Sequence, residues 1–290
     1  MTVLETIQRS AEFLAKKGVD SPRLQVESLL AHVLRLPRLN LYLNFERELT
    51  SAELEIVRGF VKRRGAREPL QHIVGSTSFC GFEIAVDPNV LIPRPETELL
   101  AERAWSFLNF LSTGRNQPTE PLAALDFGTG SGCLAVALAL KCACARIVAL
   151  DISFAALAVA RANAKRLHAT VEFLESDGFD ALPSGELFDL IVANPPYIPS
   201  AEIAVLDPEV CKFDPRLALD GGADGLDFYR RLAREAAGFL KPTGRLMLEL
   251  GDEQAASASD LLDAHNWVVE AVERDYAGRE RILVAAPGAA

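Results

Sequence analysis

Short apolar segments alternate with longer helix-like segments between residues 96 and 250, and this alternation constrains the fold more than any other feature. The apolar segments have the length of buried strands, and the segments between them carry apolar residues at helical spacing. Chains of this kind form a mostly parallel sheet with helices on both faces, so we expect a Rossmann-like α/β fold. The expected strands are 122–127, 146–150, 171–174, 187–193 and 244–250, and the expected helices are 96–111, 132–141, 154–167 and 228–240.

The segments on either side of this alternation follow different patterns. The first 70 residues predict short helices, with start signals at Ser21-Pro22 and at Thr50 with Glu53. The apolar positions of the second helix, expected to face inward, are Leu24, Leu29, Leu30, Val33 and Leu34. Two hairpins are expected, one between Pro69 and Pro95 and one from strands 267–272 and 281–285. The polar stretch 112–120 predicts a surface loop. We therefore divide the chain into a helical domain (1–75), a hairpin linker (76–95) and an α/β domain (96–290).

Composition excludes several classes of protein. The chain has 290 residues, of which 49% are hydrophobic and 24% charged, so it has enough apolar surface for a packed core. No apolar run approaches the roughly 20 residues of a membrane span, and the first residues lack the pattern of a signal peptide, so we expect a cytoplasmic protein without membrane contact. The five cysteines and four histidines lack metal-ligand spacing, so no metal site is predicted.

Charge is distributed unevenly along the chain. Residues 1–75 carry 12 basic and 9 acidic side chains, whereas residues 76–290 carry 18 basic and 31 acidic ones. An overall net charge of −10 disfavours general binding to nucleic acid, because such binding depends on Lys and Arg neutralising phosphates. The basic cluster Arg58, Lys62, Arg63, Arg64 and Arg67 has two interpretations, a solvated helix face or a docking face for an acidic partner.

A glycine-rich turn follows the strand 122–127 and leads directly into a helix. Its sequence is Asp126-Phe-Gly-Thr-Gly-Ser-Gly132, and glycines at such a turn let the backbone approach a ligand closely. Asp151 ends the next strand, 19 residues after Gly132, where a carboxylate can accept both hydroxyls of a ribose. Asp177-Gly178 follows the third strand. A nicotinamide dinucleotide is one candidate ligand, but Gly-x-Gly-x-Gly and the absence of a P-loop lysine favour S-adenosylmethionine.

The segment Asn194-Pro195-Pro196-Tyr197 follows the strand 187–193, at the same predicted edge of the sheet. It is either a proline-rich turn or a site for a planar NH2 group. The Asn194 side-chain oxygen and the Pro195 carbonyl can accept the two hydrogens of such a group, and Tyr197 offers a flat face. Two acceptors would aim the nitrogen at a methyl donor, so positioning and electrostatics would carry the rate without a strong general base.

Asn-Pro-Pro-Tyr is shared by adenine-N6 methyltransferases of nucleic acids and by protein glutamine-N5 methyltransferases, so other motifs must distinguish the two. The segments 69–75 (PLQHIVG), 79–82 (FCGF) and 90–98 (VLIPRPETE) resemble the signature of bacterial release factor glutamine methyltransferases. The segments 215–229 and 249–254 are similar to the same family, and the resemblance covers essentially the whole chain. The related enzymes that methylate a ribosomal protein usually differ at 94–98, which favours release factors.

The resemblance implies a class I methyltransferase fold and transfer of a methyl group from S-adenosylmethionine to the glutamine of the Gly-Gly-Gln loop in class I release factors. It implies that the N-terminal helices help to dock this protein substrate, and no direct nucleic-acid binding is expected. The implied cofactor-binding residues are Gly128, Thr129, Gly130, Ser131, Gly132, Asp151, Ile152, Asp177, Gly178 and Asn194. The implied catalytic residues are Asn194, Pro195 and Tyr197, and these with Pro196 and Arg94 form the substrate site. Thr97 is expected in the pocket wall.

Three positions depart from the family pattern. Asp214 stands where Glu is usual, Phe154 replaces a proline, and Gly178 replaces an aromatic residue found in some members, for which Phe179 is the expected substitute. Two rival functions remain. A nucleic-acid adenine-N6 methyltransferase would need a basic groove and a means of extracting the base, and a noncatalytic module would use the fold as a binding scaffold.

Overall fold

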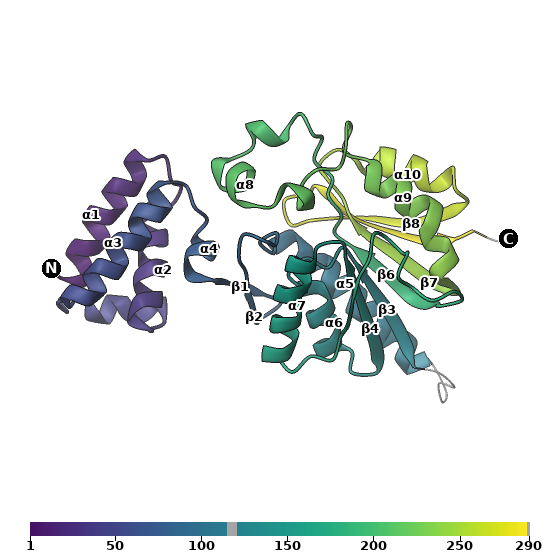
Figure 1. The fold of residues 1–290 in the computed structure, drawn as a ribbon, viewed down its shortest axis with the longest axis horizontal. Coiled ribbons are helices and arrows are strands. Elements are labelled where there is room, and N and C mark those ends of the chain that lie inside the picture. Colours follow the sequence, from purple (N-terminus) through teal and green to yellow (C-terminus); the bar gives the residue numbers. More distant parts are fainter. Residues whose placement is uncertain (115–120, 289–290) are drawn as a thin grey trace. The chain divides into compact units, whose positions relative to one another are not determined.

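The computed structural model describes residues 1–114 and 121–288. The chain forms two compact units (Figure 1). The first contains Met1–Ser76 and also Asp207–Phe213, a segment far away in the sequence. The second contains Thr77–Leu206 and Asp214–Ala290, of which 115–120 and 289–290 lie outside the described residues. The assignment of a docking domain, a linker and a catalytic domain stays a prediction.

The first unit is a bundle of short helices around one apolar core. Its elements are α1 (Val3–Lys16), α2 (Pro22–Leu34), η1 (Arg38–Asn44), α3 (Ser51–Gly65), α4 (Leu70–Val74) and α8 (Pro208–Phe213). The predicted capping box of Thr50 and Glu53 is present. Ser21 precedes α2 as predicted, but it has a left-handed backbone (φ 45°) and its side chain makes no capping hydrogen bond. Leu24 was expected to face inward and is instead exposed.

The basic cluster on α3 is partly internal to this unit. Arg64 is buried and donates to Glu209 Oε1 of α8 at 2.6 Å, and Arg67 donates to both oxygens of the same carboxylate at 2.6 Å. This pairing holds the pKa of Glu209 below its usual value although burial alone would raise it. Because Arg64 and Arg67 are engaged in this way, only Arg58, Lys62 and Arg63 of the cluster are exposed.

A seven-stranded sheet forms the centre of the second unit, in the order β5-β4-β3-β6-β7-β9-β8. The first five strands in this order are parallel, and β9 and β8 form the predicted antiparallel hairpin at the other edge. The bounds are β3 (Leu122–Phe127), β4 (Ala145–Asp151), β5 (Glu172–Glu175), β6 (Phe188–Ala193), β7 (Leu240–Glu249), β8 (Trp267–Arg274) and β9 (Glu280–Pro287). A separate hairpin of β1 (Ser76–Phe79) and β2 (Phe82–Ala85) matches the one expected before Pro95.

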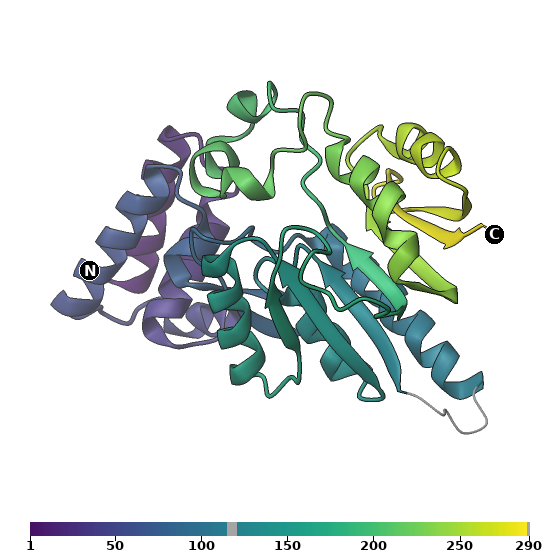
Figure 2. The same cartoon turned by 45° about the vertical axis from the view of Figure 1, so that its right-hand side comes forward.

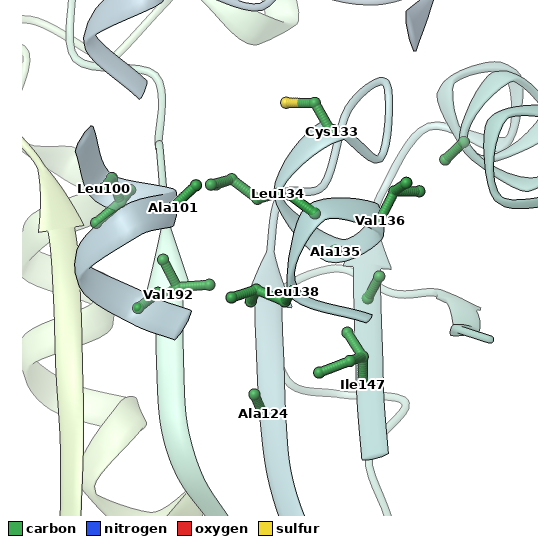
Figure 3. Close-up of a cluster of buried hydrophobic side chains, with 14 of the residues drawn as sticks. Leu100, Ala101, Ala124, Cys133, Leu134, Ala135, Val136, Leu138, Ile147 and Val192 are labelled. Carbon is green, nitrogen blue, oxygen red and sulfur yellow. The ribbon is translucent and has the colours of Figure 1, made fainter. Parts of the chain in front are cut away.

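Helices cover both faces of the sheet (Figure 1, Figure 2). One face packs against α5 (Pro95–Gly114), α6 (Cys133–Lys141) and α7 (Phe154–Arg166), and the other against α9 (Asp227–Glu235) and α10 (Ala255–Asp263). Figure 3 shows the first face, where Leu134 of α6 points toward Ala101 of α5 and Leu138 of α6 lies next to Val192 of β6. The strands are apolar on both faces because both are covered, which is why they read as continuous apolar runs in the sequence.

Most predicted elements of the second unit are present, with shifted ends. The predicted helix 228–240 ends at Glu235, a 3-10 turn η4 (Ala236–Phe239) follows, and Leu240 already belongs to β7. Residues 112–114 of the predicted surface loop continue helix α5, and the rest of that loop lies outside the described residues. Across residues 1–114 and 121–288, we find no helix with the length and apolar character needed to traverse a membrane.

Candidate active site

The carboxyl ends of four parallel strands meet along one edge of the sheet. In the order of the strands, this edge carries Asp177-Gly178 after β5, Asp151 at the end of β4, the glycine turn after β3 and Asn194 after β6. The chain order reverses between β3 and β6, and open α/β sheets bind ligands at such a switch point. A cleft of about 220 Å³ lies at this place and is lined by residues from all four strand ends.

The backbone N–H groups of the glycine turn donate hydrogen bonds that fix the turn to the neighbouring strand. Thr129 N–H donates to Leu150 O at 2.8 Å, and Gly130 N–H donates to Asp151 Oδ2 at 2.8 Å. A Cβ built on Gly128 or Gly130 meets no described atom within 4 Å, so the space in front of the turn is open. At Gly132 a Cβ would stand 2.9 Å from Ala160 Cβ, so this glycine allows α6 and α7 to pack closely.

Two carboxylates stabilise the turn from opposite sides. Asp126 is fully buried and accepts hydrogen bonds from Thr129 Oγ1 at 2.6 Å and Ala135 N–H at 3.1 Å. Its burial raises the pKa of the Asp126 carboxyl to about 7. Asp151 lines the cleft and accepts Gly130 N–H and Ser153 N–H, one on each oxygen. Burial raises the pKa of Asp151 also, although these backbone donors oppose the shift.

Arg231 of α9 lies at the β5 end of the cleft. Its guanidinium donates to the carboxylate and, at 2.9 Å, to the carbonyl of Asp177, and its Nε donates to Glu235 Oε2 at 3.1 Å. Phe179, the expected substitute for an aromatic at Gly178, is instead buried in the core beneath, where it stacks on Phe239 at 4.7 Å between ring centroids. The expectation that Phe179 contacts the ligand is therefore wrong.

Asn194 is the first residue of a hydrogen-bonded chain that leads away from the cleft. Its Nδ2 donates to Thr97 Oγ1 at 3.0 Å, and the Thr97 hydroxyl donates to Glu249 Oε2 at 2.6 Å. Thr97 belongs to α5 and Glu249 ends β7, and both side chains are buried. Tyr197 donates its hydroxyl to the other Glu249 oxygen at 3.4 Å.

This chain determines which atom of the Asn194 amide faces the ligand. When Glu249 is ionised, its carboxylate only accepts hydrogen bonds, so the Thr97 hydroxyl hydrogen points to Glu249 and the Thr97 oxygen accepts from Asn194. The atom of Asn194 that faces Thr97 is then the amide nitrogen, which leaves Oδ1 as the acceptor for a ligand. Burial raises the pKa of the Glu249 carboxyl to about 7, opposed by the Thr97 hydrogen bond and by the charge of Arg281.

Tyr197 is held from several sides. Its carbonyl accepts from Gln254 Nε2 at 2.9 Å, and a Cβ on Gly251 would overlap the Gln254 side chain. Burial and the nearby Glu249 carboxylate raise the pKa of the Tyr197 hydroxyl well above its usual range, so the phenol stays neutral and can donate.

Arg94 also lines the cleft. It donates to Asp214 Oδ2 at 2.6 Å, and the Asp214 side chain is buried. The Asp214 carboxylate therefore reaches Arg94 directly. Burial raises the pKa of Asp214 to about 6, opposed by the charge of Arg94.

The structure brings most of the predicted site residues to one cleft. Those that line it are Arg94, Gly128, Thr129, Gly130, Ser131, Asp151, Ile152, Asp177, Gly178, Asn194, Pro195 and Pro196. Gly132 and Tyr197 are not part of the lining formed by the described residues. Thr97 lines the cleft as expected.

The roles of Arg231 and Glu249 at this site were not predicted from the sequence. Arg231 had no signal, because it is one of several arginines on α9. Glu249 did have a signal in the sequence, because it is a charged residue within the apolar run Leu246–Leu250, and a charge in a buried strand needs a partner.

Comparison with known proteins agrees with this geometry. The family model described as "PrmC N-terminal domain" matches residues 5–75, and the model "Methyltransferase small domain" matches residues 110–206. A release factor glutamine methyltransferase of Geobacter sulfurreducens is 43% identical over 282 residues, which is 97% of this chain and 95% of that protein. The protein of the same name from Chlorobaculum tepidum is 42% identical over 287 residues, 97% of this chain and 96% of that protein.

Among solved structures, a methyltransferase from Pyrococcus furiosus has a TM-score of 0.51 with 17% identity, covering 83% of this chain and all of that one. A 16S rRNA N2 G1207 methyltransferase of T. thermophilus, solved with AdoMet and guanosine, has a TM-score of 0.50 and 20% identity, covering 74% of this chain and 50% of that one. At these identities the likeness establishes the fold alone.

Proposed function

The chain belongs to the family of release factor glutamine methyltransferases, and on this premise we propose that it methylates the side-chain amide nitrogen of a glutamine in peptide chain release factors. The methyl donor is S-adenosylmethionine. The glutamine is that of the Gly-Gly-Gln loop in class I release factors. Since termination of translation takes place in the cytoplasm, the enzyme acts there.

The observation that carries the proposal is the fixed orientation of the Asn194 amide. Its nitrogen is engaged by Thr97, so its Oδ1 accepts one hydrogen of a substrate NH2 group, and the Pro195 carbonyl accepts the other. Two acceptors of this kind select an NH2 group. They reject a hydroxyl, which has one hydrogen, and a carboxylate, which has none.

The cleft fits the methyl donor. The open space in front of Gly128 and Gly130 lets the backbone approach a ligand closely, as a side chain at either position would not. The Asp151 carboxylate accepts Gly130 N–H on one oxygen and Ser153 N–H on the other, and it has lone pairs left for ribose hydroxyls. When bound, S-adenosylmethionine supplies an electrophilic methyl group on a sulfonium.

The residues of the chain contribute positioning rather than proton abstraction. An amide nitrogen is a poor nucleophile because its lone pair is delocalised into the carbonyl. Asn194 and Pro195 hold both hydrogens, which aims the nitrogen and favours its rehybridisation as the N–C bond forms and the S–C bond breaks. The product nitrogen then loses one proton to water, so no general base is needed.

The helical unit contributes to docking of the release factor through its exposed basic side chains. Arg58 and Lys62 are available for an acidic partner surface, whereas Arg63 is paired with Glu68, and Arg64 and Arg67 are engaged with Glu209. Reversing the charge of Arg58 and Lys62 together should raise the KM for an intact release factor and leave it unchanged for a short peptide with the Gly-Gly-Gln sequence.

The test is transfer of a labelled methyl group from S-adenosylmethionine to three separate acceptors. These are a purified release factor, a preparation of ribosomal proteins, and nucleic acid. We expect label in the release factor only, and none when its Gly-Gly-Gln glutamine is replaced by alanine. Label in ribosomal protein or nucleic acid alone would contradict the proposed substrate.

A further inference from the structure

The cleft's β5 end has a wall that neither the motifs nor the proposed chemistry accounts for. Arg231 of α9 lines the cleft there, and its side chain is 25% exposed. A Cβ built on Gly178 would overlap Nη2, Cζ and Nε of this arginine. The guanidinium therefore occupies the volume that a side chain at position 178 would take.

Three of the five N–H donors of the guanidinium have printed acceptors, one on each nitrogen. Nη1 donates to the Asp177 carboxylate, Nη2 to the Asp177 carbonyl at 2.9 Å, and Nε to Glu235 Oε2 at 3.1 Å. These bonds, from two elements, hold the plane of the group in place. With its plane fixed in this way, the group presents a flat face, and a guanidinium face stacks well on an aromatic ring.

The order of strands indicates which part of the cofactor meets this wall. Asn194 follows β6, Asp151 ends β4, and Asp177-Gly178 follows β5 at the far end of the cleft. In S-adenosylmethionine the ribose stands between the methyl-bearing sulfur and the adenine. If the methyl group faces Asn194 and Asp151 holds the ribose, the adenine points toward β5.

We propose that the Arg231 guanidinium, fixed by Asp177 and Glu235 above Gly178, is the surface against which the adenine of the cofactor packs. The inference rests on the proposed placement of the cofactor. It makes Arg231 a binding residue and explains the need for glycine at 178, because a larger residue would displace the guanidinium.

The test is the Kd of S-adenosylhomocysteine and of its base-free analogue S-ribosylhomocysteine, measured by calorimetry and, for the weaker ligand, by ligand-observed NMR. In Arg231→Met we expect the Kd of S-adenosylhomocysteine to rise about five- to tenfold, the range expected for loss of one cation–π contact. The Kd of S-ribosylhomocysteine should change less than twofold. Arg231→Lys, which keeps the charge but not the plane, should behave like Arg231→Met.

Arg230→Met is the matched control. Arg230 neighbours Arg231 on α9 but pairs with Asp224 and Asp227 and is absent from the cleft lining of the described residues, so its replacement should leave both Kd values unchanged. An unchanged Kd of S-adenosylhomocysteine in Arg231→Met would overturn the inference. So would an equal loss for both ligands, or full rescue by lysine. Failure of the wild-type protein to bind S-adenosylhomocysteine would instead overturn the proposed cofactor site.

Discussion

Thr97→Val removes one hydroxyl and keeps nearly the same side-chain shape. The variant leaves the Asn194 acceptor in place but removes the group that orients it. In the wild-type protein this hydroxyl accepts from Asn194 Nδ2 at 3.0 Å and donates to Glu249 Oε2 at 2.6 Å. Valine can do neither. Asn194 stays in the cleft, but nothing at position 97 then selects the orientation in which its oxygen faces the substrate.

The size of the effect follows from the two lost hydrogen bonds. The bond between neutral groups is worth about 1 kcal/mol, so its loss lowers kcat about fivefold, and a shift of the acceptor by ~1 Å can extend the loss toward ~100-fold. The bond to the carboxylate leaves a buried oxygen without its donor, so the free energy of unfolding falls by about 2 kcal/mol. The Kd of S-adenosylmethionine should change less than twofold.

The assay compares Thr97→Val with Thr97→Ser, which keeps the hydroxyl. We expect Thr97→Ser to retain kcat within about threefold, while Thr97→Val loses at least about fivefold with an unchanged KM for the release factor. A Thr97→Val enzyme that turns over as fast as Thr97→Ser would refute the role assigned to the chain from Asn194 to Glu249.

Four further predictions concern Glu249, Asp151 and Glu209. Because protonated Glu249, whose carboxyl pKa is about 7, can donate to Thr97 and so reverse the direction of the hydrogen-bonded chain, kcat should fall as the pH drops below about 7, and Glu249→Gln should lose this inflection in a pH–rate profile. Since the folded protein binds the Glu249 proton more tightly than the unfolded chain does, the free energy of unfolding should fall as the pH rises from about 4.5 to about 7. In chemical denaturation, Glu249→Gln should therefore lose less stability than the wild-type protein across this pH range. Asp151→Ala should raise the Kd of S-adenosylmethionine at least about tenfold in calorimetry, and a larger effect on kcat than on Kd would argue against its ribose role. Glu209→Ala leaves the buried Arg64 without its carboxylate and should lower the free energy of unfolding of the helical unit by about 2–3 kcal/mol in urea denaturation. The control Arg58→Ala, at an exposed position, should change this free energy by less than about 0.5 kcal/mol. Equal effects of the two replacements would contradict the structural role of the ion pair.

Local sequence signals predicted the elements whose burial is continuous along the chain. Strand β3 has the predicted ends 122 and 127, because all six of its residues are buried and the glycine turn marks its end. Helix α8 was missed, since its six residues are fixed by Glu209 pairing with Arg67, 142 residues away. Helix α10 was missed because it is short and rich in small residues, which carry a weak helical pattern.

Some residues of the candidate site could likewise be placed from the sequence, and others could not. The glycine turn, Asp151 and Asn194 follow strands and could be placed at one edge from topology alone. The partners of Asn194 could not, because Thr97 and Glu249 are 152 residues apart and meet only when α5 packs beside β7. We expected Phe179, the next residue along the chain, to take the place of an aromatic side chain at position 178. Arg231 fills that space instead, from a helix that is distant in the sequence.

The most direct test of the central claim is tandem mass spectrometry of a release factor incubated with S-adenosylmethionine and either the wild-type protein or Asn194→Ala. With the wild-type protein we expect one added methyl group on the glutamine of the Gly-Gly-Gln peptide, and we expect its loss with Asn194→Ala although that variant still binds the cofactor. Methylation of the same glutamine by Asn194→Ala at the wild-type rate would show that the Asn194 acceptor is not required for methyl transfer.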